Sequence, residues 1–112
     1  MNIGDYVRLN NDVYFVEVIN RIAEIYEDKG TLLTENDGSE YQGEYSMESV
    51  IKSSPNIIDL IEIGDYVNGE RVINIIKKHG YLEVSDEEII INKKDIKSIV
   101  TKEQFSQMEY KL

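Results

Sequence analysis

A pentapeptide that occurs twice constrains the fold of this 112-residue chain more than any other feature. Ile3-Gly4-Asp5-Tyr6-Val7 returns letter for letter at residues 63–67, and Ile-Lys-Ser stands at both 51–53 and 96–98. A chain whose second half repeats the first explains both echoes. We therefore expect two tandem copies of one small unit, each near the lower size limit for an independent hydrophobic core.

The composition predicts a mostly β fold. Ala23 is the only alanine, whereas isoleucine and valine are abundant and tyrosine occurs eight times. Alanine is the best helix former, and β-branched and aromatic residues favour strands. The units should therefore be small β structures.

In the first half, hydrophobic alternation and turn residues predict five strands. The expected strands are 6–9, 13–25, 31–35, 40–46 and 51–53. A bend or bulge is expected near Asn20-Arg21, where the alternation loses its phase. Asn10-Asn11-Asp12, residues 27–30 and Asp37-Gly38 predict turns, and Ser46 is expected to cap a helical turn over 47–50.

The second half predicts a similar order with shorter connections. Strands are expected at 65–67, 71–77, 81–84, 88–92 and 96–100, with a hairpin turn at Asn68-Gly69 and a helical turn at 93–95. Thr101 should cap a short helix over 102–107, and 108–112 would add a last strand. The acidic stretch 27–45 is expected to have no counterpart here.

These patterns define three segments. Residues 1–54 form the first repeat, 55–62 a linker that holds the only proline, Pro55, and 63–112 the second repeat with its helix. Residues 57–62 form either a helical turn or an extended linker strand. Five short strands with one helical turn before the last resemble SH3-like small barrels, and Gly-Asp-x-Val is similar to the entry of KOW-type modules. The resemblance implies two tandem SH3-like β-barrel units.

Charge is strongly and unevenly negative. The net charge is −10, and residues 22–48 hold eight acids against Lys29 alone. A chain this acidic is repelled by phosphate backbones, so direct nucleic-acid binding is not expected. Solubility accounts for the acid; alternatively, the acid attracts the basic surface of another protein.

The sequence contains few residues that could support catalysis or metal binding. There is no cysteine, and the single histidine, His79, falls in a predicted turn. The acidic clusters lack the spacing of a Ca²⁺ loop, and no phosphate-binding or nucleophile motif is present. We expect no enzyme activity, no metal and no cofactor. The apolar runs are too short to cross a membrane, and no signal peptide is visible, so we expect a cytoplasmic protein.

The candidate binding residues lie in the first half. Tyr41 and Tyr45 alternate with Glu40 and Glu44, and aromatic anchors beside carboxylates suit a partner rich in arginine. Three further acids precede them, namely Glu24, Glu27 and Asp28. The alternative is an edge strand kept soluble by its acids. Tyr6 and Tyr66, at equivalent repeat positions, are expected to pack in a core or an interface.

One further resemblance concerns residues 50–106. The run IKSSPNIIDLIEIGDYVNG at 51–69 and the run IKSIVTKEQF at 96–105 resemble small phage and prophage proteins of low-GC Gram-positive bacteria. The resemblance implies a phage context, in the cytoplasm of an infected or lysogenic host. Small acidic phage proteins often inhibit host defences, and anti-CRISPR proteins are among them.

Three functions follow as hypotheses. The first is a non-enzymatic inhibitor, a monomer or homodimer, whose acidic residues cover the nucleic-acid-binding surface of a basic protein such as a Cas nuclease. The second is a phage structural or assembly adaptor. The third is a KOW-like nucleic-acid-binding barrel, for which the basic residues would be Arg71, Lys77, Lys78, Lys93, Lys94 and Lys97.

Overall fold

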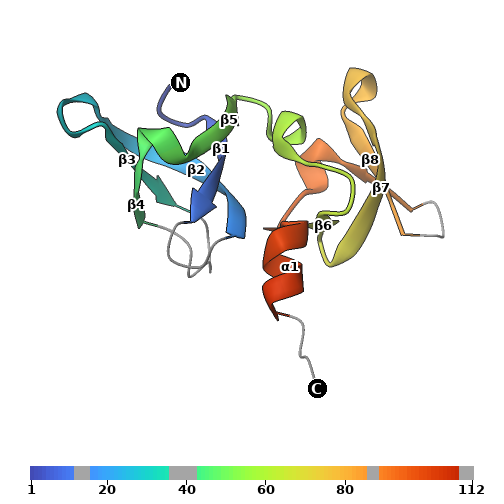
Figure 1. The fold of residues 1–112 in the computed structure, drawn as a ribbon. Helices are drawn as coiled ribbons and strands as arrows, with labels where there is room; N and C mark the ends of the chain where they lie inside the picture. Colours follow the sequence, from blue (N-terminus) through green and yellow to red (C-terminus); the bar gives the residue numbers. More distant parts are fainter. Residues whose placement is uncertain (12–15, 36–42, 86–88, 109–112) are drawn as a thin grey trace. The chain divides into compact units, whose positions relative to one another are not determined.

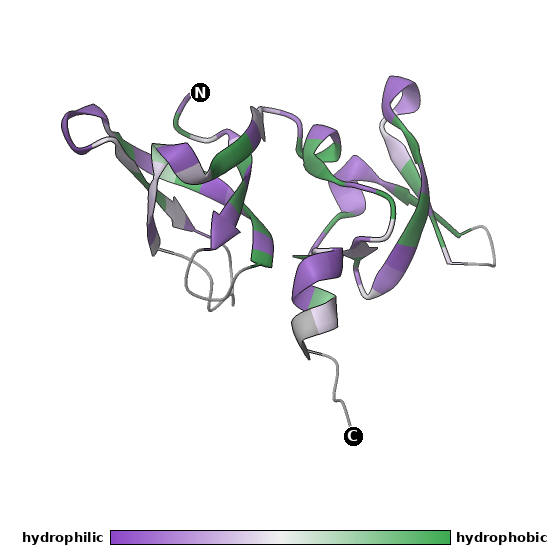
Figure 2. Cartoon of the chain, viewed as in Figure 1, coloured by the Kyte–Doolittle hydropathy of each residue, from purple (hydrophilic) through white to green (hydrophobic). Residues whose placement is uncertain are grey.

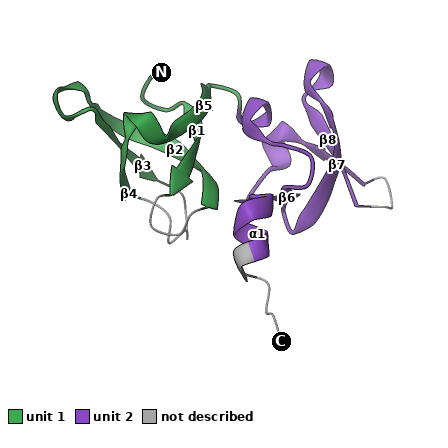
Figure 3. Cartoon of the chain, viewed as in Figure 1, with its two compact units in different colours: residues 1–56 green, residues 57–112 purple. Residues whose placement is uncertain are grey.

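The chain folds into two compact units, residues 1–56 and 57–112 (Figure 3). The computed structural model describes residues 1–11, 16–35, 43–85 and 89–108 (Figure 1). Both units are built on antiparallel sheets, so the chain is mostly β, as its composition predicts.

Unit 1 is a five-stranded antiparallel sheet with the strand order β4-β3-β2-β1-β5. Its strands are β1 (Tyr6–Asn11), β2 (Val16–Tyr26), β3 (Thr31–Glu35), β4 (Gly43–Ser46) and β5 (Val50–Ser54). Two 3₁₀ turns connect them. The turn η1 (Glu27–Lys29) joins β2 to β3, and η2 (Met47–Ser49) joins β4 to β5.

The core of unit 1 forms where alternate strand residues point to the same side. Its buried members are Val7, Leu9, Val16, Val18, Ile22 and Leu32. Period-two alternation explains this set, because β1 and β2 each contribute every second residue. Ile25, Tyr45, Met47 and Val50 pack against it from partly buried positions.

Most of the strands predicted for unit 1 are present, with two shifts. The strand 31–35 is confirmed, and Ser46 caps η2 by accepting a hydrogen bond from the Glu48 amide at 3.2 Å. The turn expected at Asn10-Asn11-Asp12 is wrong at its first two residues, because both continue β1 and Asn11 pairs with Val16. Asp12 lies outside the described residues. The bulge falls between Ile22 and Glu24, a few residues beyond its predicted place.

Unit 2 has the strand order β10-β6-β7-β8-β9. Its strands are β6 (Tyr66–Val67), β7 (Glu70–Ile76), β8 (Tyr81–Val84), β9 (Ile89–Asn92) and β10 (Ile99–Val100). The 3₁₀ turns are η3 (Ile57–Leu60), η4 (Lys77–His79) and η5 (Lys93–Asp95), and one helix follows, α1 (Lys102–Met108). Of the two forms expected for 57–62, the helical turn is therefore the one observed. It buries Ile58 and Leu60.

The closing strand of unit 2 is shorter than predicted. The side-chain oxygen of Asn68 accepts hydrogen bonds from the amides of Lys97 and Ser98, at 2.8 and 3.1 Å, so this segment is held by a side chain. The Asn68-Gly69 turn itself is confirmed, with φ of 53° and 81°. The cap of α1 is also confirmed, since Thr101 and Gln104 exchange two hydrogen bonds as a capping box. The last strand, expected at 108–112, is wrong at Met108, which ends the helix, and 109–112 lie outside the described residues.

The repeated pentapeptide forms the same hydrogen bonds in both units. The Gly4 amide donates to Ile22 O and the Gly64 amide to Val72 O, each at 2.9 Å. Both glycines have a positive φ, 93° and 99°, which favours glycine over other residues. The following aspartates bind a nearby backbone amide in the same way. The motif therefore acts as scaffold at the entry to each sheet.

The two units share one plan, and β1 to β5 correspond to β6 to β10 in order. The turns η1 and η4 match, as do η2 and η5, down to the left-handed glycines Gly30 (φ 66°) and Gly80 (φ 69°). The expectation that residues 27–45 lack a counterpart is therefore wrong for 27–35 and 43–45, and 36–42 lie outside the described residues. Most of the extra length lies in the first hairpin of unit 1. Twelve residues separate the paired Val7 and Asn20, whereas two separate Val67 and Glu70.

Candidate protein-binding surface on unit 1

The outer face of strands β2, β3 and β4 gathers acidic side chains. Leu33 pairs with Glu24 on one side and with Glu44 on the other, so these three residues form one row across the sheet. Paired residues of an antiparallel sheet point to the same side. Both glutamates are exposed and Leu33 is half-buried. The row places an apolar side chain between two carboxylates.

A second row on the same face adds a tyrosine. Tyr26 pairs with Thr31 and lies two positions from Glu24 along β2. Its hydroxyl donates to a carboxylate oxygen of Glu24, and the Thr31 hydroxyl donates to Glu44 at 2.7 Å. We call the residues of these two rows the acidic face, which consists of Glu24, Tyr26, Thr31, Leu33 and Glu44.

The electrostatics of the acidic face keep Tyr26 protonated. Its hydrogen bond to Glu24 raises the pKa of the phenol above 10.0, and loss of solvent and the charges of Glu24 and Glu44 add to the effect. The ring also interacts with a cation, because Lys29 Nζ lies 5.3 Å from its centroid. The face therefore already holds one ammonium group over its aromatic ring, a geometry of cation–π type.

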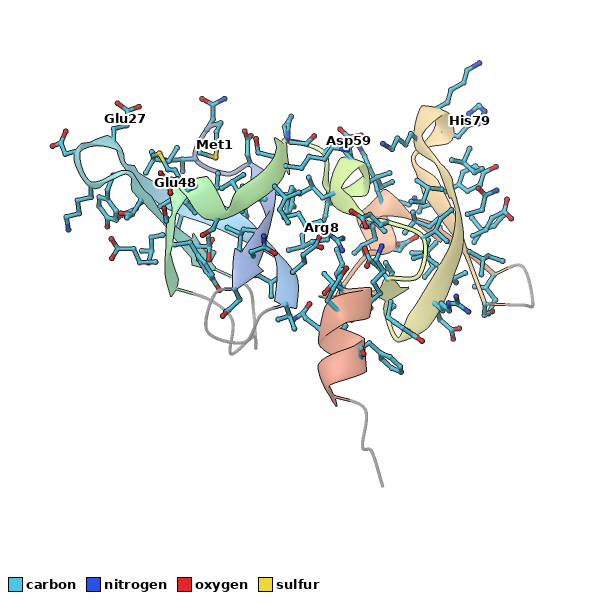
Figure 4. The ribbon with its side chains drawn as sticks, in the orientation of Figure 1. Met1, Arg8, Glu27, Glu48, Asp59 and His79 are labelled. Atoms are coloured by element: carbon cyan, nitrogen blue, oxygen red, sulfur yellow. The ribbon has the colours of Figure 1, made fainter. Side chains whose placement is uncertain are left out.

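The turn η1 continues this acidic surface. Glu27 and Asp28 are exposed at the start of the turn, and Figure 4 shows Glu27 pointing away from the strands. An open hollow lies beside the turn, lined by Met1, Asn2, Ile3, Ile25, Tyr26, Glu27, Asp28 and Lys29. Acids, an aromatic ring and apolar side chains thus occur together at this end of unit 1.

Tyr45 lies on the opposite face of the sheet from Glu24 and Glu44. It pairs with Leu32, packs against the core, and its hydroxyl accepts a hydrogen bond from Asn11 Nδ2 at 3.1 Å. Partial burial raises the pKa of the Tyr45 phenol, although the bond from Asn11 opposes the shift. The expected exposed aromatic at this position is therefore a packing residue.

The structure brings together some of the sequence candidates and adds others. Glu24 and Glu44 share one face, and Glu27 and Asp28 share the adjoining turn, whereas Glu40 and Tyr41 lie outside the described residues. Sequence reasoning missed Tyr26 and Leu33. The position of Tyr26 follows from the phase of β2 beyond Asn20, which the bulge before Glu24 resets, and that of Leu33 from its pairing with Glu24 and Glu44.

Two further features were sought among the described residues, a metal-binding group and a membrane-spanning helix. Across residues 1–11, 16–35, 43–85 and 89–108, no three His, Asp or Glu side chains gather where they could hold a metal ion. No helix among those residues has the length and apolar character needed to span a membrane.

The comparisons with known proteins add no relative. No protein-family model, curated protein or solved structure matches the chain. The surface just described is therefore the basis for any assignment.

Proposed function

We propose that the chain is a non-enzymatic binding protein that applies the acidic face of unit 1 to a basic surface of another protein. The observation that supports this most is the row Glu24–Leu33–Glu44 beside Tyr26. An apolar and aromatic centre with a charged rim is the arrangement found at protein interfaces. The overall negative charge would speed encounter with a basic partner.

The partner chemistry follows from the groups on the face. Carboxylates at Glu24 and Glu44 accept hydrogen bonds from arginine, and a tyrosine ring accepts a cation on its surface. Lys29 already occupies the ring of Tyr26 within the same unit. An arginine of the partner would replace that lysine and gain the two nearby carboxylates. Proteins that bind nucleic acid present basic surfaces of this kind to the phosphates.

A phage-encoded inhibitor of a host nuclease is the concrete form of this proposal. The resemblance of residues 50–106 to phage proteins supports it, and an anti-CRISPR protein acting on a Cas nuclease is one case. Inhibition would be steric and electrostatic, because the acidic face would occupy the surface that binds DNA or guide RNA. The proposal also treats both units as SH3-like small barrels, which the shared strand order and the 3₁₀ turn before the last strand support.

The test reverses two charges on the face. In the variant Glu24→Lys/Glu44→Lys, affinity for a basic nuclease should fall about tenfold or more, since two attractive contacts become repulsive. Binding of the unmodified chain should weaken steeply with salt, as screening shortens the range of surface charges. Both quantities can be measured by calorimetry, with DNA cleavage by a Cas nuclease as the functional readout.

The matched control is Glu83→Lys/Asp95→Lys, which changes the net charge by the same amount within unit 2. It should leave the affinity nearly unchanged. Equal losses in the two variants would show that only net charge matters. Binding that does not respond to salt would contradict the proposal.

An assembly adaptor is the second candidate, and one observation favours it. Strand β9 is an edge of its sheet and exposes Ile89 and Ile90, with 41% and 56% of their surfaces accessible. Exposed apolar edge strands favour pairing with another chain, and proteins usually guard them with charge. The equivalent residues of unit 1 are Gly43 and Glu44.

Molar mass in solution separates the two candidates. An adaptor should gain mass as concentration rises, and Ile90→Lys should abolish that gain. If the chain is instead the inhibitor, the unmodified chain and Ile90→Lys should both keep the molar mass of a monomer or dimer at the two concentrations. The measurement is light scattering at two concentrations.

A further inference from the structure

Two adjacent turns of unit 2 gather basic side chains. The turn η4 carries Lys77, Lys78 and His79, and the turn η5 carries Lys93 and Lys94. The turns are neighbours, because the Lys93 amide donates to Gly80 O at 3.0 Å. We call these five residues the basic turn pair. Both turns are strongly hydrophilic in Figure 2.

The side chains of the basic turn pair are exposed, and the described residues of unit 2 form no ion pair with its lysines. In the part of the chain that the structure describes, none of the four lysines forms an ion pair with a carboxylate. Lys102, by contrast, lies 2.6 Å from Glu62 and is satisfied there. The four lysines therefore keep their charge available for an external anion.

The corresponding turns of unit 1 show that the fold does not require this charge. Glu27, Asp28 and Lys29 stand where unit 2 has Lys77, Lys78 and His79. Met47 and Glu48 stand where it has Lys93 and Lys94. The backbone is the same in both cases, so the basic residues are not needed to form the turns.

An aromatic pair adjoins the lysines. The rings of His79 and Tyr81 are nearly parallel, with centroids 6.2 Å apart and an interplanar angle of 14°. His79 lies at the outer end of the β7–β8 hairpin (Figure 4). Aromatic rings beside lysines are the combination by which proteins hold single strands, because unpaired bases stack while phosphates meet the cations.

We propose that the basic turn pair binds single-stranded nucleic acid. The lysines of η4 and η5 contact successive phosphates, and the His79–Tyr81 pair offers a surface for a base. A duplex would use the lysines alone, since its bases are paired and stacked. The proposal does not depend on the acidic face of unit 1, which lies on other residues.

The negative net charge weakens this binding without forbidding it. At physiological salt, charges more than about 8 Å apart are largely screened, so a bound phosphate responds mainly to the nearest groups. Asp95 is the one acid on the two turns, against four lysines. The earlier expectation of no direct nucleic-acid binding was based on the charge of the whole chain, and the local charge of these turns has the opposite sign. Affinity in the non-specific range, roughly 10⁻⁴ to 10⁻⁶ M, is expected.

The experiment measures fluorescence anisotropy of a labelled 12-nucleotide single strand of mixed sequence with the full chain. Four phosphate contacts predict a slope of about −3 for log affinity against log salt, or about 50-fold weaker binding between about 50 and about 200 mM. The variant Lys78→Glu/Lys94→Glu should bind at least about tenfold more weakly. Tyr81→Ala should weaken single-strand binding several-fold and leave duplex binding unchanged.

The control is Lys29→Glu/Lys52→Glu, which makes the same change of net charge on exposed lysines of unit 1. It should retain most of the affinity. Equal losses in the two double variants, no binding at the lower salt concentration, or tighter binding of a matched duplex would each overturn the proposal. Equal binding of a poly-glutamate peptide would do the same, because it would show an unselective anion surface. Circular dichroism of each variant verifies the fold.

Discussion

The two units place opposite charges on the same turns. In unit 1, η1 begins with Glu27 and Asp28, whereas in unit 2, η4 begins with Lys77 and Lys78. Both turns end on a left-handed glycine whose carbonyl accepts the next turn's amide, at 2.9 and 3.0 Å. Backbone geometry is therefore set by the glycines and the strand pairing, and the exposed side chains are free to differ. This contrast separates residues that build the fold from residues available for binding.

The aspartate of the repeated motif should show the largest difference between the units. Asp65 is fully buried and accepts hydrogen bonds from the amides of Glu62 and Lys102, at 2.8 and 2.9 Å. Asp65→Ala should lower the free energy of unfolding by about 4 kcal/mol, because it leaves buried donors unsatisfied. Asp5 is only partly buried, and Asp5→Ala should cost about 1 kcal/mol.

Urea unfolding followed by circular dichroism measures both aspartate variants. Asp65→Asn, which keeps one acceptor oxygen, should recover part of the loss. Equal costs at the two positions would mean that the motif does the same work in both units.

The central leucines should behave alike. Leu32 and Leu82 occupy equivalent positions and are both fully buried. Each leucine-to-alanine change should cost about 3 kcal/mol through lost burial and the cavity left behind. Amide hydrogen exchange should show which unit each variant destabilises. A much smaller loss in the free energy of unfolding for one leucine than for the other would show that the two cores are not equivalent.

Asn68 should stabilise the closing segment of unit 2 through its side chain. Its side chain accepts from the Lys97 and Ser98 amides and donates to Asp95 O, while its φ is 53°. Asn68→Ala should cost about 2 kcal/mol, from lost hydrogen bonds and strain at positive φ. Faster exchange of the Lys97 and Ser98 amides should accompany the loss. Asn68→Gly relieves the strain alone, so a smaller cost for glycine separates the two contributions.

Tyr45 should give the smallest effect and a pH dependence. Tyr45→Phe removes the hydroxyl bonded to Asn11 and should cost about 1 kcal/mol near neutral pH. Since burial raises the pKa of this phenol in the folded state, its contribution is fully present below pH 10.0 and is lost as pH rises through the folded value. The difference between the two proteins should therefore shrink in alkaline solution. A constant difference in urea midpoint up to pH about 11 would contradict this.

Local signals predicted much of the fold, and tertiary detail decided the rest. An Asn-Gly pair favours a tight hairpin turn, and a threonine followed three residues later by a glutamine favours a helix start. The turn at Asn68-Gly69 and the cap at Thr101 therefore follow from the sequence. The bulge before Glu24 does not, because no residue type requires it at that position. That one-residue shift set which side chains of β2 face outward, so Tyr26 was missed. Tyr45 was placed on the wrong face because its pairing with the buried Leu32 is a tertiary contact that the sequence does not show.

The residue-by-residue match between the two units could not be predicted for a similar reason. Asn20 and Glu70 are equivalent in strand pairing, yet twelve and two residues separate them from their partner valines. Sequence letters alone could not align these segments, because between the pentapeptide and the repeated Ile-Lys-Ser the shared property is a pattern of burial. Leu32 and Leu82 align only when the hydrogen-bonded register is known.

The unequal first hairpins also show how this fold can be engineered. Gly4 and Ile22 close the base of the long hairpin with the same bonds that Gly64 and Val72 use for the short one. Hairpin length is thus independent of the anchoring bonds, and lengthening a closed loop adds only a small entropic penalty. A peptide epitope inserted between Asn68 and Gly69, with the flanking strand pairs kept, should be displayed without loss of the sheet. Each unit then serves as a scaffold onto which a recognition loop of chosen length can be grafted.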